Sequence, residues 1–289
     1  MTTAIFGATG KVGQLVARQL LMRGETVHAV VRDRDKAQRY LGSSDALFIE
    51  EVPLDDLGAV ITAIRGASMI FVAMGSIGIE GNIQRTVLEA ARRSATLCQI
   101  VRLPVLNTST SSLGINQRAH STIDFAAALA GLPYTTLEPA IFSASILVAA
   151  EEIRDHRTWT GLADTGKVAL IDHRDVADVA VHILAEPSTW GSHYQLTGPT
   201  LMTWPHAMAL LSFELKRRIR FLRVPEHDLL NRMLAFGVAP GFAELLITRE
   251  WAIEAGENER ITHTVTDLTG QKPRTVEAYL HANRGVFLP

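Results

Sequence analysis

The sequence is poor in cysteine and contains no long apolar segment. Cys98 is its single cysteine, so both an intrachain disulfide and a cysteine-based zinc site are excluded. The first residues, Met1 to Phe6, form neither a basic segment nor the start of a long apolar one, and no run of 18 apolar residues occurs. These absences predict a soluble cytoplasmic protein without a signal peptide or a membrane span.

Neither sign of charge is in large excess. The 28 basic residues are balanced by 30 acidic ones, which gives a net charge of −2. Nucleic acids and anionic membranes bind proteins through a clear cationic excess, so we expect neither as a partner. Apolar residues make up 47% of the chain, enough for a large core, and 289 residues fit two domains or one large one.

Short apolar runs alternate with longer amphipathic ones through the first half of the chain. Thr3–Phe6, Thr26–Val31 and Ser68–Ala73 are such runs, and each is followed by a stretch with helical character. Strands that are apolar along their whole length are typical of a parallel sheet covered on both faces. We therefore predict an α/β fold, a Rossmann-type doubly wound parallel sheet with a smaller helix-rich substrate cap.

The predicted domains interleave along the chain. The dinucleotide-binding core spans 1–138 and is completed by 162–186, where one more strand–helix pair occurs. The substrate-binding cap is expected to comprise 139–161 and 187–289, in which Gly, Pro and Trp recur between helical patterns. Trp159–Gly166 carries two glycines and an aspartate, which predicts a loop. With no long linker between the parts, we expect one compact unit, as a monomer or a homodimer.

Three glycines with the spacing G-x-x-G-x-x-G follow the first apolar run and open a helical pattern. The first allows a tight turn, the second lets backbone approach a pyrophosphate, and the third lets the helix pack on the strand. The pyrophosphate would bind the free N–H groups at the helix start. A P-loop is excluded, because Val12 follows Lys11 where that motif needs Ser or Thr after the lysine. The predicted cofactor contacts of this turn are Gly7, Thr9, Gly10, Lys11, Val12 and Gly13.

The end of the second apolar run bears on the choice between NADP and NAD. An arginine there accepts the 2′-phosphate of NADP, whereas an acid binds the ribose hydroxyl of NAD. Arg32 comes first and favours NADP(H), but Asp33 follows it directly and keeps NAD open.

Several segments resemble one known family. The patterns Gly-Ala-Thr-Gly-Lys-Val-Gly from Gly7 and Val-Val-Arg ending at Arg32 are similar to those of atypical short-chain dehydrogenase/reductases of the NmrA-like and isoflavone-reductase-like type. Four further segments, in the same order, extend the resemblance over the whole chain: Gly131–Pro139, Leu170–Ala177, Tyr194–Pro199 and Leu268–Thr275. The resemblance implies an NAD(P)-binding Rossmann fold.

The resemblance also exposes a missing proton relay. Most reductases of the wider superfamily carry a serine after the fifth strand and a Tyr-x-x-x-Lys pair on the next helix. Pro104 stands in the place of the serine, Asn116 in that of the tyrosine and His120 in that of the lysine. His120 and Asn116 are therefore the candidate catalytic residues. The proton comes from His120, directly or through water, or from an acidic hydroxyl of the substrate itself, while His120 positions ribose or substrate.

The remaining site residues are expected along the carboxyl edge of the sheet. Beyond the glycine turn and Arg32, the predicted contacts of NADP(H) are Met74, Gly75, Leu103, Pro104, His120, Pro139, Ala140, Ile141 and Phe142. The predicted substrate contacts are Phe142, Ile146 and Trp159, and the apolar lining they form suits a flat apolar small molecule. Asp172–Asp175 offers no three convergent ligands, so no metal site is predicted.

Three functions remain open on the sequence alone. The first is NADPH-dependent hydride transfer to a ketone or quinone carbonyl, with a polyketide-type aromatic of antibiotic biosynthesis as one substrate class. The second is a redox sensor that binds NADP and turns nothing over. The third is an isomerase or dehydratase on the same fold.

Overall fold

A computed structural model describes residues 1–75, 79–106 and 111–288. The chain forms two compact units, each of which is described by itself. Unit 1 comprises Met1–Val105, Ala119–Glu138 and His173–Gln195, and unit 2 comprises the intervening and following segments, Leu106–Arg118, Pro139–Asp172 and Leu196–Pro289.

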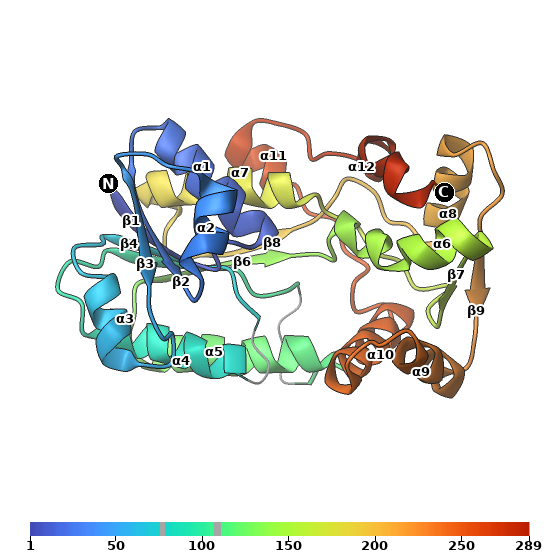
Figure 1. The fold of residues 1–289 in the computed structure, drawn as a ribbon, viewed down its shortest axis with the longest axis horizontal. Helices are drawn as coiled ribbons and strands as arrows, with labels where there is room; N and C mark the ends of the chain where they lie inside the picture. Colours follow the sequence, from blue (N-terminus) through green and yellow to red (C-terminus); the bar gives the residue numbers. More distant parts are fainter. Residues whose placement is uncertain (76–78, 107–110, 289) are drawn as a thin grey trace. The chain divides into compact units, whose positions relative to one another are not determined.

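Within the described residues, seven strands form one sheet in the order β3-β2-β1-β4-β5-β6-β8 (Figure 1). The registered pairs β1–β2, β2–β3, β1–β4, β4–β5 and β5–β6 are all parallel. The order runs outward from β1 in both directions, which is the doubly wound arrangement that the sequence predicts. The strands are β1 (Thr2–Phe6), β2 (Thr26–Val31), β3 (Leu47–Glu51), β4 (Met69–Val72), β5 (Gln99–Arg102), β6 (Tyr134–Pro139) and β8 (His193–Leu196).

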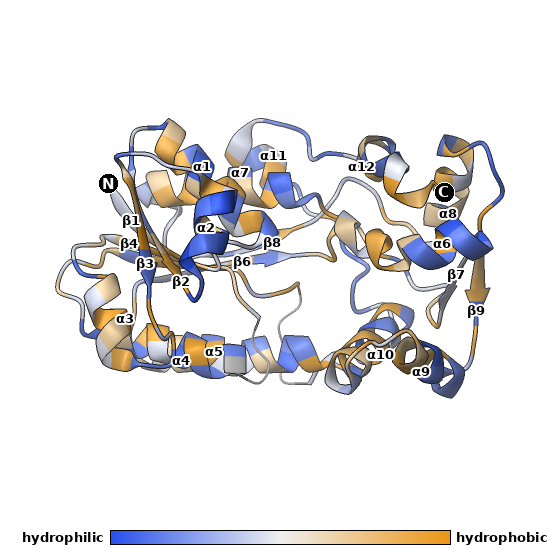
Figure 2. Cartoon of the chain, viewed as in Figure 1, coloured by the Kyte–Doolittle hydropathy of each residue, from blue (hydrophilic) through white to orange (hydrophobic). Residues whose placement is uncertain are grey.

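Helices cover both faces of this sheet. α1 packs with α7 on one face, and α3 packs with α4 on the other (Figure 1). Because of this double cover, β4 and β5 are buried along their whole length. Figure 2 shows α2 mainly in hydrophilic colours, and only Ala37 and Leu41 of that helix are buried. The helices are α1 (Lys11–Met22), α2 (Arg34–Leu41), α3 (Leu57–Ala63), α4 (Ile79–Arg92), α5 (Ile115–Leu129) and α7 (His173–Ala185), with the 3₁₀ turn η2 (Pro187–Thr189).

Unit 2 is mainly helical and has its own core. Trp159 and Trp204 pack there with ring centroids 4.7 Å apart. The buried Glu250 ties this core to a neighbouring turn, because its carboxylate accepts hydrogen bonds from the Trp204 indole (3.2 Å) and the Ala163 amide (3.2 Å). The elements are η1 (Ser143–Ala149), α6 (Ala150–His156), β7 (Thr158–Gly161), α8 (Trp204–Glu214), β9 (Arg220–Arg223), α9 (Glu226–Ala235), α10 (Pro240–Glu254), α11 (Thr264–Thr269), α12 (Val276–Asn283) and η3 (Arg284–Phe287).

Two sequence expectations differ from the structure. The predicted loop at Trp159–Gly166 begins inside a strand, because β7 pairs in parallel with β9. The segment 162–172, placed in the sheet core by the sequence, lies in unit 2, since Leu162, Val168 and Leu170 pack in cores of that unit. The elements η2 and β8, which the sequence analysis placed in the cap, belong mainly to unit 1, where β8 lies beside β6.

Two further features bear on function classes. Among the described residues, no helix combines the length and the apolar composition that crossing a membrane requires. The same residues contain no group of three or more His, Cys, Asp or Glu side chains that could hold a metal ion.

Candidate functional site

The glycine turn after β1 is built on close backbone approaches. Gly7 has a φ of +84°, and a Cβ atom there would collide with the carbonyl oxygen of Ala73. A Cβ atom on Gly13 would collide in turn with the carbonyl of Gly7. Gly10 caps α1 without a side-chain hydrogen bond, and the first turn of α1 contains no acidic residue. The N–H groups at this helix start are therefore suited to a negatively charged ligand.

A cavity of about 260 Å³ lies between this turn and the end of β2. It brings together four of the predicted cofactor residues and adds Lys36, which sequence reasoning missed. Among the described residues, neither the Arg32 guanidinium nor the Lys36 ammonium has a hydrogen-bond or ion-pair partner. Two uncommitted cations in one cavity suit a phosphate group. The cavity is lined by Gly7, Ala8, Thr9, Val30, Val31, Arg32, Asp33, Lys36, Leu54 and Met74.

The role of Asp33 favours NADP over NAD. Its carboxylate caps α2 by accepting a hydrogen bond from the Lys36 amide at 2.8 Å. The acid that kept NAD open is thus engaged as a helix cap, whereas Arg32 beside it is free to meet a phosphate.

A second cavity of about 250 Å³ shares Arg32 and Leu54 with the first. Val52, Pro53 and Ile83 give it an apolar lining, and Glu51 and Asp55 add carboxylates. An apolar recess beside an arginine that suits a phosphate also suits the flat ring of a nucleotide base. The glycine turn and the two cavities together fit a dinucleotide that carries an additional phosphate.

The other predicted contacts of unit 1 lie beside the sheet edge. Leu103 and Pro104 directly follow β5 and are buried, and the Leu103 amide donates to Val72 at 2.9 Å. The Gly75 carbonyl accepts a hydrogen bond from the Gln84 side chain at 2.5 Å. Lys11, Val12 and Gly13 form the first turn of α1.

The predicted residues of unit 2 do not form one lining. Trp159 lines a cavity of about 230 Å³, whereas Ile146 is completely buried in the core and Phe142 bridges to Ile171. The Ala140 amide donates to Leu196 at 2.7 Å. The cavity is lined by Val148, Ala149, Glu151, Glu152, Trp159, Thr160, Leu229, Arg232, Met233, Phe236, Val238 and Leu246.

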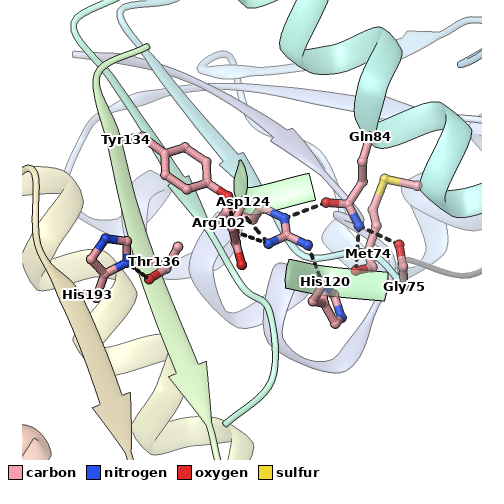
Figure 3. Close-up of polar contacts among 9 residues, drawn as sticks. All are labelled: Met74, Gly75, Gln84, Arg102, His120, Asp124, Tyr134, Thr136 and His193. Atoms are coloured by element: carbon pink, nitrogen blue, oxygen red, sulfur yellow. Dashed lines mark hydrogen bonds and ion pairs between the residues drawn. The ribbon is translucent and has the colours of Figure 1, made fainter. Parts of the chain in front are cut away.

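His120 lies in a buried polar network around Arg102, which is only 1% exposed (Figure 3). The guanidinium donates to the Gln84 side-chain oxygen at 2.7 Å, to the Asp124 carboxylate and to His120 Nδ1. It also lies 3.4 Å from the Tyr134 hydroxyl. Sequence reasoning missed Arg102, although a charged residue at the end of the apolar segment Ile100–Val101 was an available signal.

This network keeps His120 neutral. Burial, and next the positive charge of Arg102, hold the pKa of His120 well below its usual 6.5. Burial also raises the pKa of Tyr134, whose hydroxyl donates to Asp124 at 2.5 Å. The pKa of His120 argues against an imidazolium as the proton donor at neutral pH. The other predicted role of His120, binding ribose or substrate, stays open, and Asn116 lies half-buried in the first turn of α5.

Comparison with known proteins identifies the family to which the chain belongs. A family model described as NAD(P)H-binding matches residues 7–187. The chain belongs to this NAD(P)H-binding family. The match begins at the first glycine of the turn and ends just beyond α7, so it covers all the residues that line both cavities of unit 1.

Relatives extend the match over the whole chain. Quinone oxidoreductase 2 of Escherichia coli K12 is 25% identical over 276 residues, which cover 94% of this chain and 95% of the relative. The solved NADPH complex of the E. coli NADPH-dependent quinone oxidoreductase has a TM-score of 0.89 at 24% identity, covering 98% of this chain and 99% of that one. NmrA, a negative transcriptional regulator, has a TM-score of 0.79 at 20% identity, covering 97% and 94%.

These matches agree with the geometry of the site. The chain has the Rossmann fold of the NmrA and quinone oxidoreductase structures, and its family is one that binds NAD(P)H. The general class of activity is that of an NAD(P)H-dependent oxidoreductase.

Cofactor choice depends on Arg32. Arg32→Ala is expected to weaken NADPH binding by roughly tenfold to a hundredfold, because one charge-assisted contact to a phosphate contributes about 1.5–3 kcal/mol. NADH binding should change little. Calorimetric titration of both cofactors measures this, with Arg39→Ala as the control, an arginine on α2 that lies outside the cavity. Equal affinity of the parent protein for NADH and NADPH would show that the assignment is wrong.

The glycine turn can be tested separately. Gly10→Val places branched carbons next to the Gly7 carbonyl, at the position where backbone must approach the pyrophosphate. We expect NADPH binding to be lost while the circular dichroism spectrum and melting curve remain those of a folded protein. Gly241→Val, where a side chain meets open space, is the matched control. Near-normal NADPH binding by folded Gly10→Val would remove the cofactor from this turn.

The low pKa of His120 predicts a loss of stability in acid. Below about pH 6.5 an unfolded histidine binds a proton that His120 in the folded protein does not, so the unfolding free energy decreases as pH falls. His120→Asn removes this contribution. Urea unfolding at pH 7.5 and pH 5.5 should therefore show a smaller acid-induced loss for the variant than for the parent. An identical pH dependence of the two proteins would contradict the burial of a neutral imidazole.

Proposed function

We propose that the protein reduces flat, apolar quinones with NADPH. The observation that carries this proposal is the absence of a proton donor from the places where the superfamily keeps its relay. Pro104 has no hydroxyl, Asn116 has no acidic proton, and the pKa of His120 keeps its ring neutral. A quinone is the carbonyl acceptor that least needs such a donor.

The difference lies in the basicity of the product oxygen. Hydride addition to an ordinary ketone leaves an alkoxide, a strong base whose conjugate acid is about as weak an acid as water, so the alkoxide must be protonated as it forms. Reduction of a quinone leaves a phenolate-type oxygen, whose conjugate acid has a pKa of about 10. One hydride and one proton convert the quinone to the hydroquinone, and water is sufficient as the source of the proton.

The residues of unit 1 hold the cofactor and do not exchange protons with the substrate. The bound cofactor supplies the hydride. The start of α1 binds the pyrophosphate, Arg32 and Lys36 bind the ribose phosphate, and the buried His120 ring offers a neutral N–H donor to a ribose or substrate oxygen. Leu103 and Pro104 supply an apolar surface beside these groups.

The lining of the cavity in unit 2 suits an apolar aromatic substrate. Trp159, Met233, Phe236 and Leu246 are among its eight apolar lining residues. Its polar part contains Arg232, which makes an ion pair with Glu152 at 3.3 Å. Aromatic and aliphatic walls with few polar groups are typical of sites for flat organic molecules.

An aromatic ketone of the polyketide type is the second candidate substrate class. A phenol beside its carbonyl can pass a proton to the forming alkoxide, so such a ketone also fits a site without a proton relay. Methylation of that phenol removes the proton and separates this class from quinones.

Substrate choice gives a direct test. We expect NADPH oxidation with naphthoquinones, and rates at least about a hundredfold lower with a plain aromatic ketone, because a missing general acid costs about 10²–10⁴ in rate. His120→Gln should lower kcat for the quinone by less than about tenfold, since the proton comes from water. Absorbance at the NADPH band measures all of these rates.

Two outcomes would overturn the proposal. If plain ketones were reduced at the same rate as quinones, a proton donor would have to act at the site. Tight NADPH binding without turnover of quinones or hydroxyketones would favour the NADP-binding sensor that the sequence left open.

A further inference from the structure

Arg102 is a buried cation that the core does not need. Burying an ion pair contributes little stability compared with apolar side chains of similar volume, so the presence of Arg102 in the sheet calls for another explanation. It lies at the carboxyl end of β5, directly before Leu103 and Pro104. We propose that Arg102 is a positioning residue of the cofactor site, which orients His120 as a ligand donor and fixes the Met74 and Gly75 carbonyls through Gln84. This inference rests on the proposed function.

The contact with Arg102 determines which nitrogen of His120 carries the proton. A guanidinium has donors and no acceptor, so His120 Nδ1 must accept and the proton must be on Nε2. Among the described residues, Nε2 has no hydrogen-bond partner. The ring is 2% exposed and cannot reorient freely. Arg102 thus leaves one uncommitted N–H donor in a fixed direction, and the nearby positive charge strengthens it as a donor.

Gln84 links Arg102 to the loop after β4 through hydrogen bonds of its side-chain amide. Its side-chain oxygen accepts from Arg102 Nε at 2.7 Å, which fixes the orientation of the amide. Its nitrogen then donates to the Met74 carbonyl at 3.2 Å and to the Gly75 carbonyl at 2.5 Å (Figure 3). Met74 lines the cavity that holds Arg32. One guanidinium therefore orients groups on α5 and in the loop after β4.

Charge balance explains how Arg102 is tolerated. The Asp124 carboxylate pairs with the guanidinium and also accepts from the Tyr134 hydroxyl. A lysine at this position would keep the positive charge, but its single nitrogen lacks the planar fork that meets Gln84, Asp124 and His120 at once. Arg102→Lys therefore keeps the positive charge and removes the planar set of donors, so it tests the two contributions separately.

Two substitutions of His120 separate the structural contact from the donor. Asn places its amide near the position of Nδ1, so His120→Asn retains an acceptor for Arg102 and loses the outer donor. Gln reaches the position of Nε2, so His120→Gln retains the donor and loses the acceptor for Arg102. We expect His120→Asn to be the more stable variant and His120→Gln to bind NADPH more tightly, by about threefold to tenfold for one hydrogen bond.

The experiment combines this pair with nitrogen-15 NMR of the histidine rings. For the parent we expect His120 to have a protonated Nε2 and an unprotonated Nδ1, unchanged from pH 8 to pH 5.5. Arg102→Lys should lose this fixed tautomer and bind NADPH roughly tenfold more weakly, with a raised KM for NADPH and a smaller change in kcat. Arg92→Lys, an exposed arginine in an ion pair with Glu89, is the control.

The inference is wrong if His120 carries its proton on Nδ1, if its ring titrates in this range, or if the Asn and Gln variants bind NADPH equally. If Arg102→Lys does not fold, comparison of NADPH binding by the two His120 variants still tests the inference. The NMR and binding measurements need no turnover, so they stand even if quinones are not reduced. Normal quinone reduction and NADPH binding by folded Arg102→Lys would reject the inference while the proposed function stands.

Discussion

The contact between the β1–α1 turn and the backbone after β4 is the constraint on which the cofactor site depends. Gly7 and Gly13 allow this turn to lie against the Ala73 carbonyl and against itself, where any Cβ atom would collide. The contact sets the start of α1 at the carboxyl edge of the sheet, beside the end of β2. The cavity with its two free cations exists because these three segments meet there.

The sequence predicted those parts of the molecule that depend on local patterns. The apolar runs predicted the parallel sheet and the glycine spacing predicted the turn, and two of the predicted cofactor contacts, Gly7 and Arg32, line one cavity. The choice between Arg32 and Asp33 stayed open, because the hydrogen bond from the Lys36 amide to Asp33 is visible only when the turn is folded.

The features that sequence reasoning missed depend on contacts between distant segments. Arg102 is 18 residues from Gln84 and 18 residues from His120, and only the packing of α4 and α5 on the sheet brings the three together. Strand β7 was missed because its partner β9 follows some 60 residues later and supplies the pairing that its own short sequence does not indicate. Lys36 was not predicted as a site residue, because its part in the cavity depends on the direction of α2.

The site illustrates how a fold can lose a proton relay and keep its cofactor. The groups proposed to bind a dinucleotide lie in the glycine turn, at the end of β2 and in the loop after β4, whereas the relay positions lie after β5 and on α5. Because the two sets belong to different segments, replacement of the relay leaves the cofactor cavity unchanged. The proposed quinone acceptor, whose reduced oxygen is a weak base, fits a site without that relay.

The two stacked indoles of unit 2 have a spectroscopic consequence. The rings of Trp159 and Trp204 lie 4.7 Å apart with their planes tilted by 45°, and Phe221 meets Trp159 edge-on with a centroid separation of 6.0 Å. Transition dipoles this close and this oblique couple to one another, which gives a pair of circular dichroism bands of opposite sign in the indole region. Trp159 also lines the cavity of that unit, so the protein carries an intrinsic optical reporter at the wall of this cavity.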